Sequence, residues 1–166
     1  MDRVDFESAA VGEKEPLRLW LRLFATTSQI AAEIAARLRK HFGISLAQFD
    51  YLAQLYRSSD ADVPMSELGR RLMVTSGNVT GLTDRLERRG WVLRERAAHD
   101  RRTQYVRLTA EGRARFEAIA AEHQRWVQEL TGGLDLEARR ALFVLLGRLK
   151  KSARHARAQP TREAVA

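Results

Sequence analysis

The sequence predicts a mainly α-helical fold with a small β-hairpin wing, in which a winged helix-turn-helix lobe lies between N- and C-terminal dimerisation helices. Three observations predict this fold. Long helical patterns with one apolar face occupy both ends, two short helical patterns lie close together in the middle, and an arginine-rich hairpin, RERAAHDRRTQYVRLT, follows them directly. The stretch from Met65 to Thr109 holds ten Lys/Arg and five Asp/Glu residues, so it carries more than half of the chain's net charge of +8. Such a concentration is typical of a surface that binds nucleic acid.

The first long helix is expected from Pro16 to His41, because apolar residues recur there at spacings of three and four. A basic last turn followed by Gly43 marks its end. A helix of this length spans about 39 Å. One small domain rarely buries so long an apolar stripe by itself, so we expect a partner chain to cover it.

The middle of the chain predicts a helix-turn-helix motif. Polar capping residues precede each helical pattern, and a glycine follows the last one. The expected elements are a helix capped by Ser45, a loop over residues 57–63 that ends at Pro64, a helix over Glu67–Leu72 begun by Ser66, and a helix begun by Thr75 or Ser76 and ended by Gly90.

A two-stranded wing is expected directly after this motif. Trp91–Arg96 and Thr103–Leu108 have strand composition, and the tip between them is polar. Two further helices are predicted over Glu111–Leu130 and from Glu137 to about Ala156. Gly132 and Gly133 separate these helices, and Asp135 can cap the second one.

The second helix of the motif has two different faces in projection. Val79, Leu82, Thr83 and Leu86 fall on the side expected to face the core. Glycines on the opposite face each cost about 1 kcal/mol relative to alanine, so something should offset them. Either the bare face enters the DNA major groove, or it relieves crowding against another helix. The outer positions are Gly77, Gly81, Asp84 and Arg88, flanked by Asn78, Thr80 and Arg85.

The wing tip supplies long cationic side chains next to a carboxylate. An arginine at a hairpin tip can enter a narrow A·T minor groove, where the negative potential is enhanced. Asp100 would hold Arg102 in a fixed pose, so that less entropy is lost on docking. The residues expected to contact DNA are Ser76, Gly77, Asn78, Thr80, Gly81, Arg85, Arg101 and Arg102, with Asp84 and Asp100 orienting the wing.

The order of these elements, the sequence RLERRGWV and the wing together resemble the MarR family of winged-helix transcriptional regulators. That family's wing signature is D-x-R-x-x-x-V-x-L-T, and Asp100, Arg102, Val106, Leu108 and Thr109 match it position by position. On this resemblance we expect a MarR-type winged-helix domain over residues 16–156, with the DNA-binding lobe at 45–109 and dimerisation helices at 16–42 and 110–156. Residues 1–15 are expected to form a disordered arm and residues 157–166 a frayed tail.

The resemblance implies a homodimer whose two winged lobes bind adjacent major grooves of a pseudopalindromic operator. It also implies that an aspartate of the recognition helix pairs with a wing arginine, positions that Asp84 and Arg102 occupy here. Many members carry a basic residue where this chain has Gly81. That departure shifts the expected base contacts onto Asn78, Thr80 and Arg85.

Members of this family are commonly repressors, here expected of a catabolic or efflux operon, that a small and often aromatic anion releases from DNA. The segments LRLWLRLF and LMVTSGNVTGLTDRL are similar to regulators that sense hydroxycinnamoyl-CoA thioesters, in which case Arg37, Arg39 and Lys40 could meet the CoA phosphates. For the aromatic residues, the competing interpretation is packing in the dimer or lobe core. The candidate effector-binding residues are Trp20, Arg22, Phe24, Arg39, His41, Phe49 and Tyr56.

Composition argues against other classes of function. The chain has no cysteine, its four histidines lie far apart, and no phosphate-binding glycine loop is present, so we expect no enzyme activity, no metal and no cofactor. An acidic start and the lack of a long apolar run predict a soluble cytoplasmic protein whose partner is duplex DNA and not a membrane. The alternative is an RNA- or membrane-surface-binding protein that uses the basic tail Arg148, Lys150, Lys151, Arg154 and Arg157.

Overall fold

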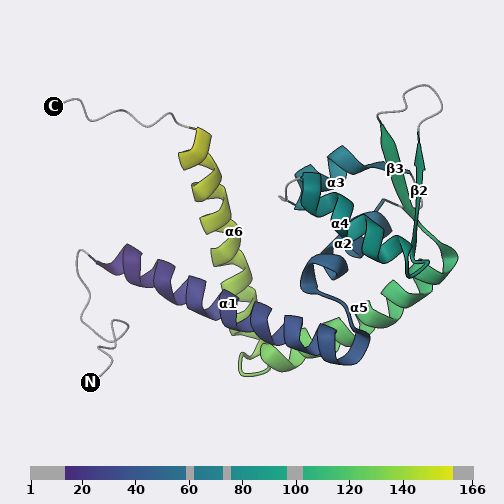
Figure 1. Cartoon of the computed structure of the whole chain (residues 1–166). Coiled ribbons are helices and arrows are strands. Elements are labelled where there is room, and N and C mark those ends of the chain that lie inside the picture. The colour runs from purple at the N-terminus through teal and green to yellow at the C-terminus, as the bar shows by residue number, and fades with distance from the viewer. Residues whose placement is uncertain (1–13, 59–61, 73–75, 97–102, 159–166) are drawn as a thin grey trace, which may run out of the picture. The chain divides into compact units, whose positions relative to one another are not determined.

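The computed structural model describes residues 14–58, 62–72, 76–96 and 103–158, apart from the side chains of Ser76, Arg157 and Ala158 (Figure 1). These residues form six α-helices and three short β-strands, as expected for a mainly helical protein with a wing. The chain divides into two compact units, one that ends at Arg125 and one that begins at Trp126. None of the described helices has an apolar stretch long enough to cross a membrane.

Helix α1 (Glu15–Phe42) has the predicted bounds to within one residue. Gly43 ends it in the left-handed conformation, with φ of 63°, and its N–H bonds to carbonyls of the last turn. Ile34 and Leu38 of its C-terminal half are buried. Its N-terminal half leaves large apolar side chains in solvent, namely Leu17, Leu19, Trp20, Leu21 and Phe24.

Helix α2 (Leu46–Tyr56) forms the centre of the lobe. Ser45 caps it as expected, in a reciprocal capping box with Gln48. It packs against α1, α3, α4 and β3. Because it is surrounded on several sides, most of its side chains are buried, namely Gln48, Phe49, Tyr51, Leu52, Ala53 and Leu55.

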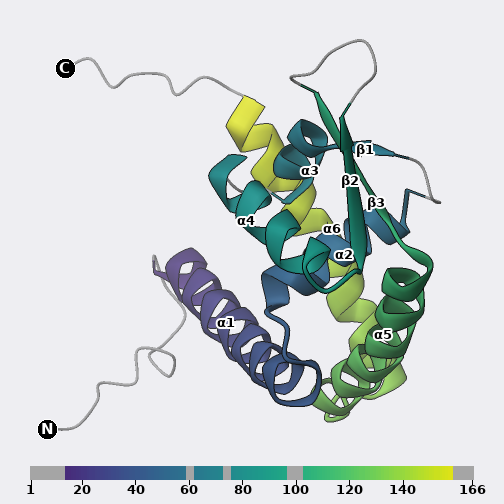
Figure 2. The same cartoon turned by 45° about the vertical axis from the view of Figure 1, so that its right-hand side comes forward.

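The sheet contains one strand more than the sequence predicts. Strands β1 (Val63–Pro64), β2 (Val92–Arg96) and β3 (Gln104–Leu108) pair antiparallel in the order β1-β3-β2 (Figure 2). The prediction that residues 57–63 form only a loop is therefore wrong at its end, because Val63 pairs with Val106. Pro64 is tolerated because β1 is an edge strand, where a missing N–H need not break a ladder.

Helices α3 (Met65–Leu72) and α4 (Ser76–Glu87) are the two helices of the helix-turn-helix. Helix α3 begins one residue before Ser66, so Ser66 lies inside the first turn and does not precede the helix as predicted. Helix α4 ends at Glu87, and a turn continues to Gly90, whose φ is 71°. The N–H of Trp91 bonds back to the carbonyl of Leu86, and β2 begins at the next residue.

Two long helices follow the wing. Helix α5 (Ala110–Leu130) and helix α6 (Leu136–Ala158) each extend slightly beyond their predicted bounds. Asp135 caps α6 as predicted, because its Oδ1 accepts from the N–H of Ala138 at 2.8 Å. Within the second unit, α6 carries a row of exposed large apolar side chains, namely Leu136, Leu142, Phe143, Val144, Leu145, Leu146 and Leu149.

Candidate DNA-binding surface

The inner face of α4 packs as the projection predicts. Val79, Leu82 and Leu86 are buried against the lobe core, and Thr83 is buried with them. Helix α4 contacts α2, α3 and β2. Three neighbouring elements therefore determine how α4 lies on the lobe and which residues it presents outward.

A buried hydrogen bond fixes the same face. The hydroxyls of Tyr51 and Thr83 lie 2.6 Å apart, and the Thr83 hydroxyl also lies 2.8 Å from the carbonyl of Val79. Burial raises the pKa of Tyr51 to about 12. Tyr51 stays protonated at neutral pH. A hydrogen bond between two neutral hydroxyl groups therefore connects α2 to the middle of α4.

The outer face of α4 has open space where its glycines lie. A Cβ built on Gly77 or Gly81 meets no heavy atom within 4 Å. Within the described chain, relief of crowding against another helix therefore does not account for these glycines. Asn78, Thr80 and Arg85 are exposed beside them, as the projection predicts.

The wing base is bonded to α4 through Arg94. Its Nη2 lies 2.8 Å from Oδ1 of Asp84 and 2.6 Å from Oε2 of Glu87. Partial burial disfavours the charge of Arg94, but its hydrogen bonds with Glu87 and Asp84 outweigh that effect and raise its pKa. Asp84 thus has a partner on β2 that the sequence did not indicate. The expected pairing with Arg102, and the roles given to Asp100 and Arg101, lie outside the described residues.

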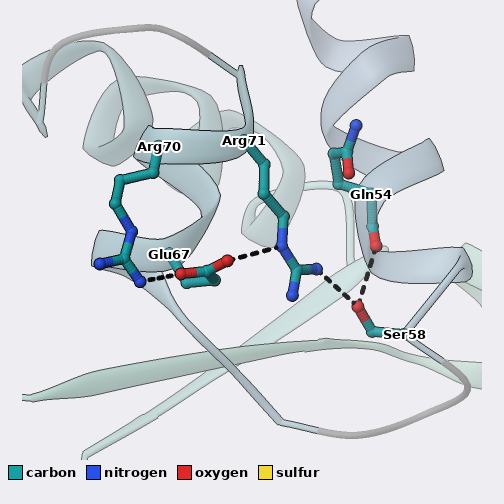
Figure 3. Close-up of polar contacts among 5 residues, drawn as sticks. All are labelled: Gln54, Ser58, Glu67, Arg70 and Arg71. Atoms are coloured by element: carbon teal, nitrogen blue, oxygen red, sulfur yellow. Dashed lines mark hydrogen bonds and ion pairs between the residues drawn. The ribbon is translucent and has the colours of Figure 1, made fainter. Parts of the chain in front are cut away.

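The exposed side of α3 carries basic residues that Glu67 organises (Figure 3). Glu67 pairs with Arg70, and its Oε1 lies 3.0 Å from Nε of Arg71. Arg71 also donates to the hydroxyl of Ser58 at 2.9 Å, and that hydroxyl donates to the carbonyl of Gln54. This network joins the start of the helix-turn-helix to the end of α2. Sequence reasoning did not include these residues, although the three- and four-residue spacing of Glu67, Arg70 and Arg71 is a signal for such pairs.

A second basic side chain links the lobe to the end of α1. Arg89 donates from Nη2 to the carbonyl of Gly43 at 2.6 Å, and its guanidinium lies 5.1 Å from the ring centre of Trp91. Gly43 ends α1, and Arg89 lies in the turn that follows α4. The end of the first helix is therefore bonded directly to the segment between α4 and the wing.

The candidate effector residues fall into separate groups. Trp20 and Phe24 stack on each other, with ring centres 5.6 Å apart, and are 56% and 58% exposed. Phe49 instead packs 5.6 Å from Phe116, and Tyr56 lies 4.8 Å from the same ring. Phe49 is buried, which favours the interpretation as lobe core. Along α1, Arg22, Arg39 and His41 are exposed, while Arg37 pairs with Glu33 at 2.7 Å.

Helix α5 adds two further side chains to this aromatic cluster, and sequence reasoning did not include them among the candidate residues. The ring of His123 lies 4.6 Å from that of Phe49, and the guanidinium of Arg113 lies 4.8 Å from the ring of Tyr56. Burial lowers the pKa of His123, and the Asp50 carboxylate only partly offsets this effect. Burial likewise raises the pKa of Asp50. The seven-residue spacing of Phe116 and His123 was the available signal that they share a face.

These observations define the class of the protein. Two short helices close together in the chain, an antiparallel strand pair after them and a recognition helix with an exposed polar face make a winged helix-turn-helix. In such motifs the second helix enters the major groove while neighbouring elements contact the backbone.

Comparison with known proteins identifies the family within that class. The sequence profile of the MarR family matches residues 42–103. The uncharacterized HTH-type transcriptional regulator YkoM of Bacillus subtilis is 32% identical over 125 residues, which cover 75% of this chain and 80% of YkoM. The chain belongs to the MarR family of DNA-binding transcriptional regulators.

Solved structures show the same fold. AbsC, a MarR family regulator from Streptomyces coelicolor, superposes with a TM-score of 0.75 at 24% identity, and the match covers 92% of this chain and all of AbsC. A MarR variant from E. coli, solved in complex with operator DNA, superposes with a TM-score of 0.70 at 28% identity. That match covers 84% of this chain and 99% of the MarR chain.

Proposed function

We propose that the chain is a ligand-responsive repressor that binds a pseudopalindromic operator as a homodimer, with α4 in the major groove. The observation that carries this proposal is the outer face of α4, where Gly77 and Gly81 leave open space beside exposed polar side chains. Without side chains at these two positions, the helix backbone can approach base edges closely. Asn78, Thr80 and Arg85 are then the residues that reach bases or phosphates.

The wing supplies the second part of the proposed interface. The pairs of Arg94 with Asp84 and Glu87 hold β2 against α4, so the hairpin starts from a fixed base. As cations of the expected hairpin tip, Arg101 and Arg102 would reach the adjacent minor groove, where narrow A·T sequences attract arginine. Asp100 would hold Arg102 in a fixed pose.

A homodimer is supported by apolar surface that each unit leaves uncovered. In the first unit, Trp20 and Phe24 of α1 are more than half exposed. In the second unit, Phe143 of α6 is 80% exposed. Apolar rows of this extent on long helices are typical of surfaces that a partner covers. Two copies related by a twofold axis would present two α4 helices to the two halves of an inverted repeat.

For the effector, we propose a small aromatic anion or an aryl-CoA thioester that releases the protein from an operator of a catabolic or efflux operon. Tyr56 supports this, because its ring is partly exposed and lies under the Arg113 guanidinium. An aromatic surface beside a fixed cation suits an aromatic acid. Arg39 and Lys40, exposed in the last turn of α1, are the cations that a CoA phosphate could meet.

The test is a footprint over the promoter region next to the protein's own gene, at moderate salt. We expect a protected inverted repeat, and Arg85→Ala should weaken its binding by about 1 to 3 kcal/mol. Arg115→Ala is the matched control, because Arg115 is also an exposed arginine but lies on α5, and it should bind almost as the unchanged protein does. If no inverted repeat is protected, the regulator proposal fails.

The effector is tested by adding aromatic acids and their CoA thioesters to the preformed complex. One of these compounds should abolish protection, and Tyr56→Ala should then require a higher concentration of it. Protection that persists with every compound in the series would contradict this part of the proposal while leaving operator binding intact.

A further inference from the structure

The recognition helix carries a charge of the wrong sign for its proposed role. Between Ser76 and Glu87 the charged residues are Asp84, Arg85 and Glu87, so α4 by itself has one negative charge in excess. Two carboxylates near a phosphate backbone repel it. Cations outside these twelve residues have to offset that charge. Arg88 and Arg89 follow in the next turn, and Arg94 of β2 is bonded to both carboxylates.

We infer that Arg94 is a positioning residue for DNA binding, which pairs with both carboxylates of α4 and offsets the one excess negative charge of that helix. This inference rests on the proposed function and deepens it. The residue acts through Asp84 and Glu87, and no direct contact with DNA is assigned to it.

The geometry shows how one side chain serves both carboxylates. Asp84 and Glu87 are three residues apart, so they lie on the same side of α4 and would repel each other without a shared cation. Nη2 of Arg94 lies within 2.8 Å of a carboxylate oxygen of each. The guanidinium comes from β2, outside the helix, and it remains charged at every physiological pH.

Partial burial separates this role from those of the surface arginines. The side chain of Arg94 is 24% exposed, whereas that of Arg70 on α3 is 77% exposed. Asp84 and Glu87 are themselves 40% and 33% exposed. The carboxylates are therefore exposed enough for their charge to act on bound DNA, while the Arg94 side chain is less exposed than either.

Four proteins test the inference: the unchanged chain, Arg94→Gln, the double variant Asp84→Asn with Glu87→Gln, and the triple variant that combines all three changes. Each is titrated against the operator and against a random duplex of the same length. We expect Arg94→Gln to weaken binding to both duplexes about tenfold, with a smaller loss at high salt, because the repulsion is screened. The triple variant should recover most of this loss, because no carboxylate is left to neutralise.

Controls separate the possible causes. Thermal unfolding curves give the folded fraction of each variant, and the binding constants are calculated from the concentration of folded protein. A variant that binds weakly only because it unfolds is thereby recognised. Arg94→Lys keeps the charge without the planar fork and should bind between Arg94→Gln and the unchanged chain. A triple variant as weak as Arg94→Gln, or an Arg94→Gln protein that binds like the unchanged chain, overturns the inference. If the operator is bound no better than the random duplex, the proposed operator recognition fails, yet the random duplex still reports on neutralisation.

Discussion

Tyr51 shows how a single buried polar residue fixes the recognition helix. Replacing it with phenylalanine removes the hydroxyl that lies 2.6 Å from Thr83, and Thr83 keeps only its contact with the Val79 carbonyl. We expect Tyr51→Phe to lower the free energy of unfolding by about 1 to 2 kcal/mol in chemical denaturation. Tyr56→Phe is the control, because that hydroxyl bonds to Glu117 in an exposed position and its loss should change stability less. Equal effects of the two variants would contradict this account.

The stability of the lobe should depend on pH through His123. Burial places its pKa below the ordinary 6.5, so the unfolded chain takes up the proton first as the pH falls through 6.5. The free energy of unfolding should therefore decrease as the pH falls from 6.5 toward the lower pKa of His123 in the folded protein. An NMR titration of the His123 ring should show a midpoint below 6.5. Asp50→Asn should lower that midpoint further, because the carboxylate opposes the shift. A midpoint at or above 6.5 would contradict the prediction.

For single residues, the sequence predicted which side of a helix a side chain lies on better than it predicted which side chain it contacts. The projection placed Thr83 on the inner side of α4, where it is buried. Its partner Tyr51 lies 32 positions earlier, and no local spacing connects the two. The same holds for Arg94, which lies in the predicted strand Trp91–Arg96 and which only the fold brings beside Asp84. Such pairs depend on tertiary packing, which a periodic pattern does not contain.

Among the helices, α5 starts at a close contact that only glycine permits. A Cβ on Gly112 would lie 1.8 Å from the carbonyl oxygen of Trp91. We expect Gly112→Ala to lower the free energy of unfolding by about 2 to 4 kcal/mol, because backbone atoms must move apart. Gly81→Ala is the matched control in α4, where the added methyl meets no atom within 4 Å and should raise stability by up to about 1 kcal/mol. Denaturation curves of both variants check the opposite signs.

The elements themselves were predicted well where their signals are local. Capping by Ser45, the stop at Gly43 and the amphipathic period of the long helices all lie within a few residues of the boundaries that they set. Strand β1 escaped prediction because it has only two residues and one of them is proline. Its existence depends on β3, more than 40 residues later, and not on any alternation of its own.

For the whole molecule, the exposed rows on α1 and α6 predict the oligomeric state. We expect light scattering to give twice the 18.9 kDa mass of one chain. Leu142→Asp together with Leu149→Asp should shift the mass toward that of one chain, because these leucines lie seven residues apart on one side of α6 and burying their charged replacements is costly. Arg140→Asp, which changes the net charge by the same two units at another exposed position of α6, should leave the mass unchanged. A doubly substituted protein that keeps the doubled mass would rule out this face as the interface.

The open space around Gly77 and Gly81 has a consequence for how this regulator can change over generations. At most positions of a recognition helix, a new side chain must satisfy both the fold and the DNA, and many variants are lost to unfolding. At these two positions an added Cβ meets no heavy atom of the described chain within 4 Å, and most residues suit a helix better than glycine does. Selection there acts almost entirely through the operator. A library randomised at Gly77 and Gly81 should therefore yield many folded proteins with altered operator preferences. Natural mutations at the same two positions should have the same effect.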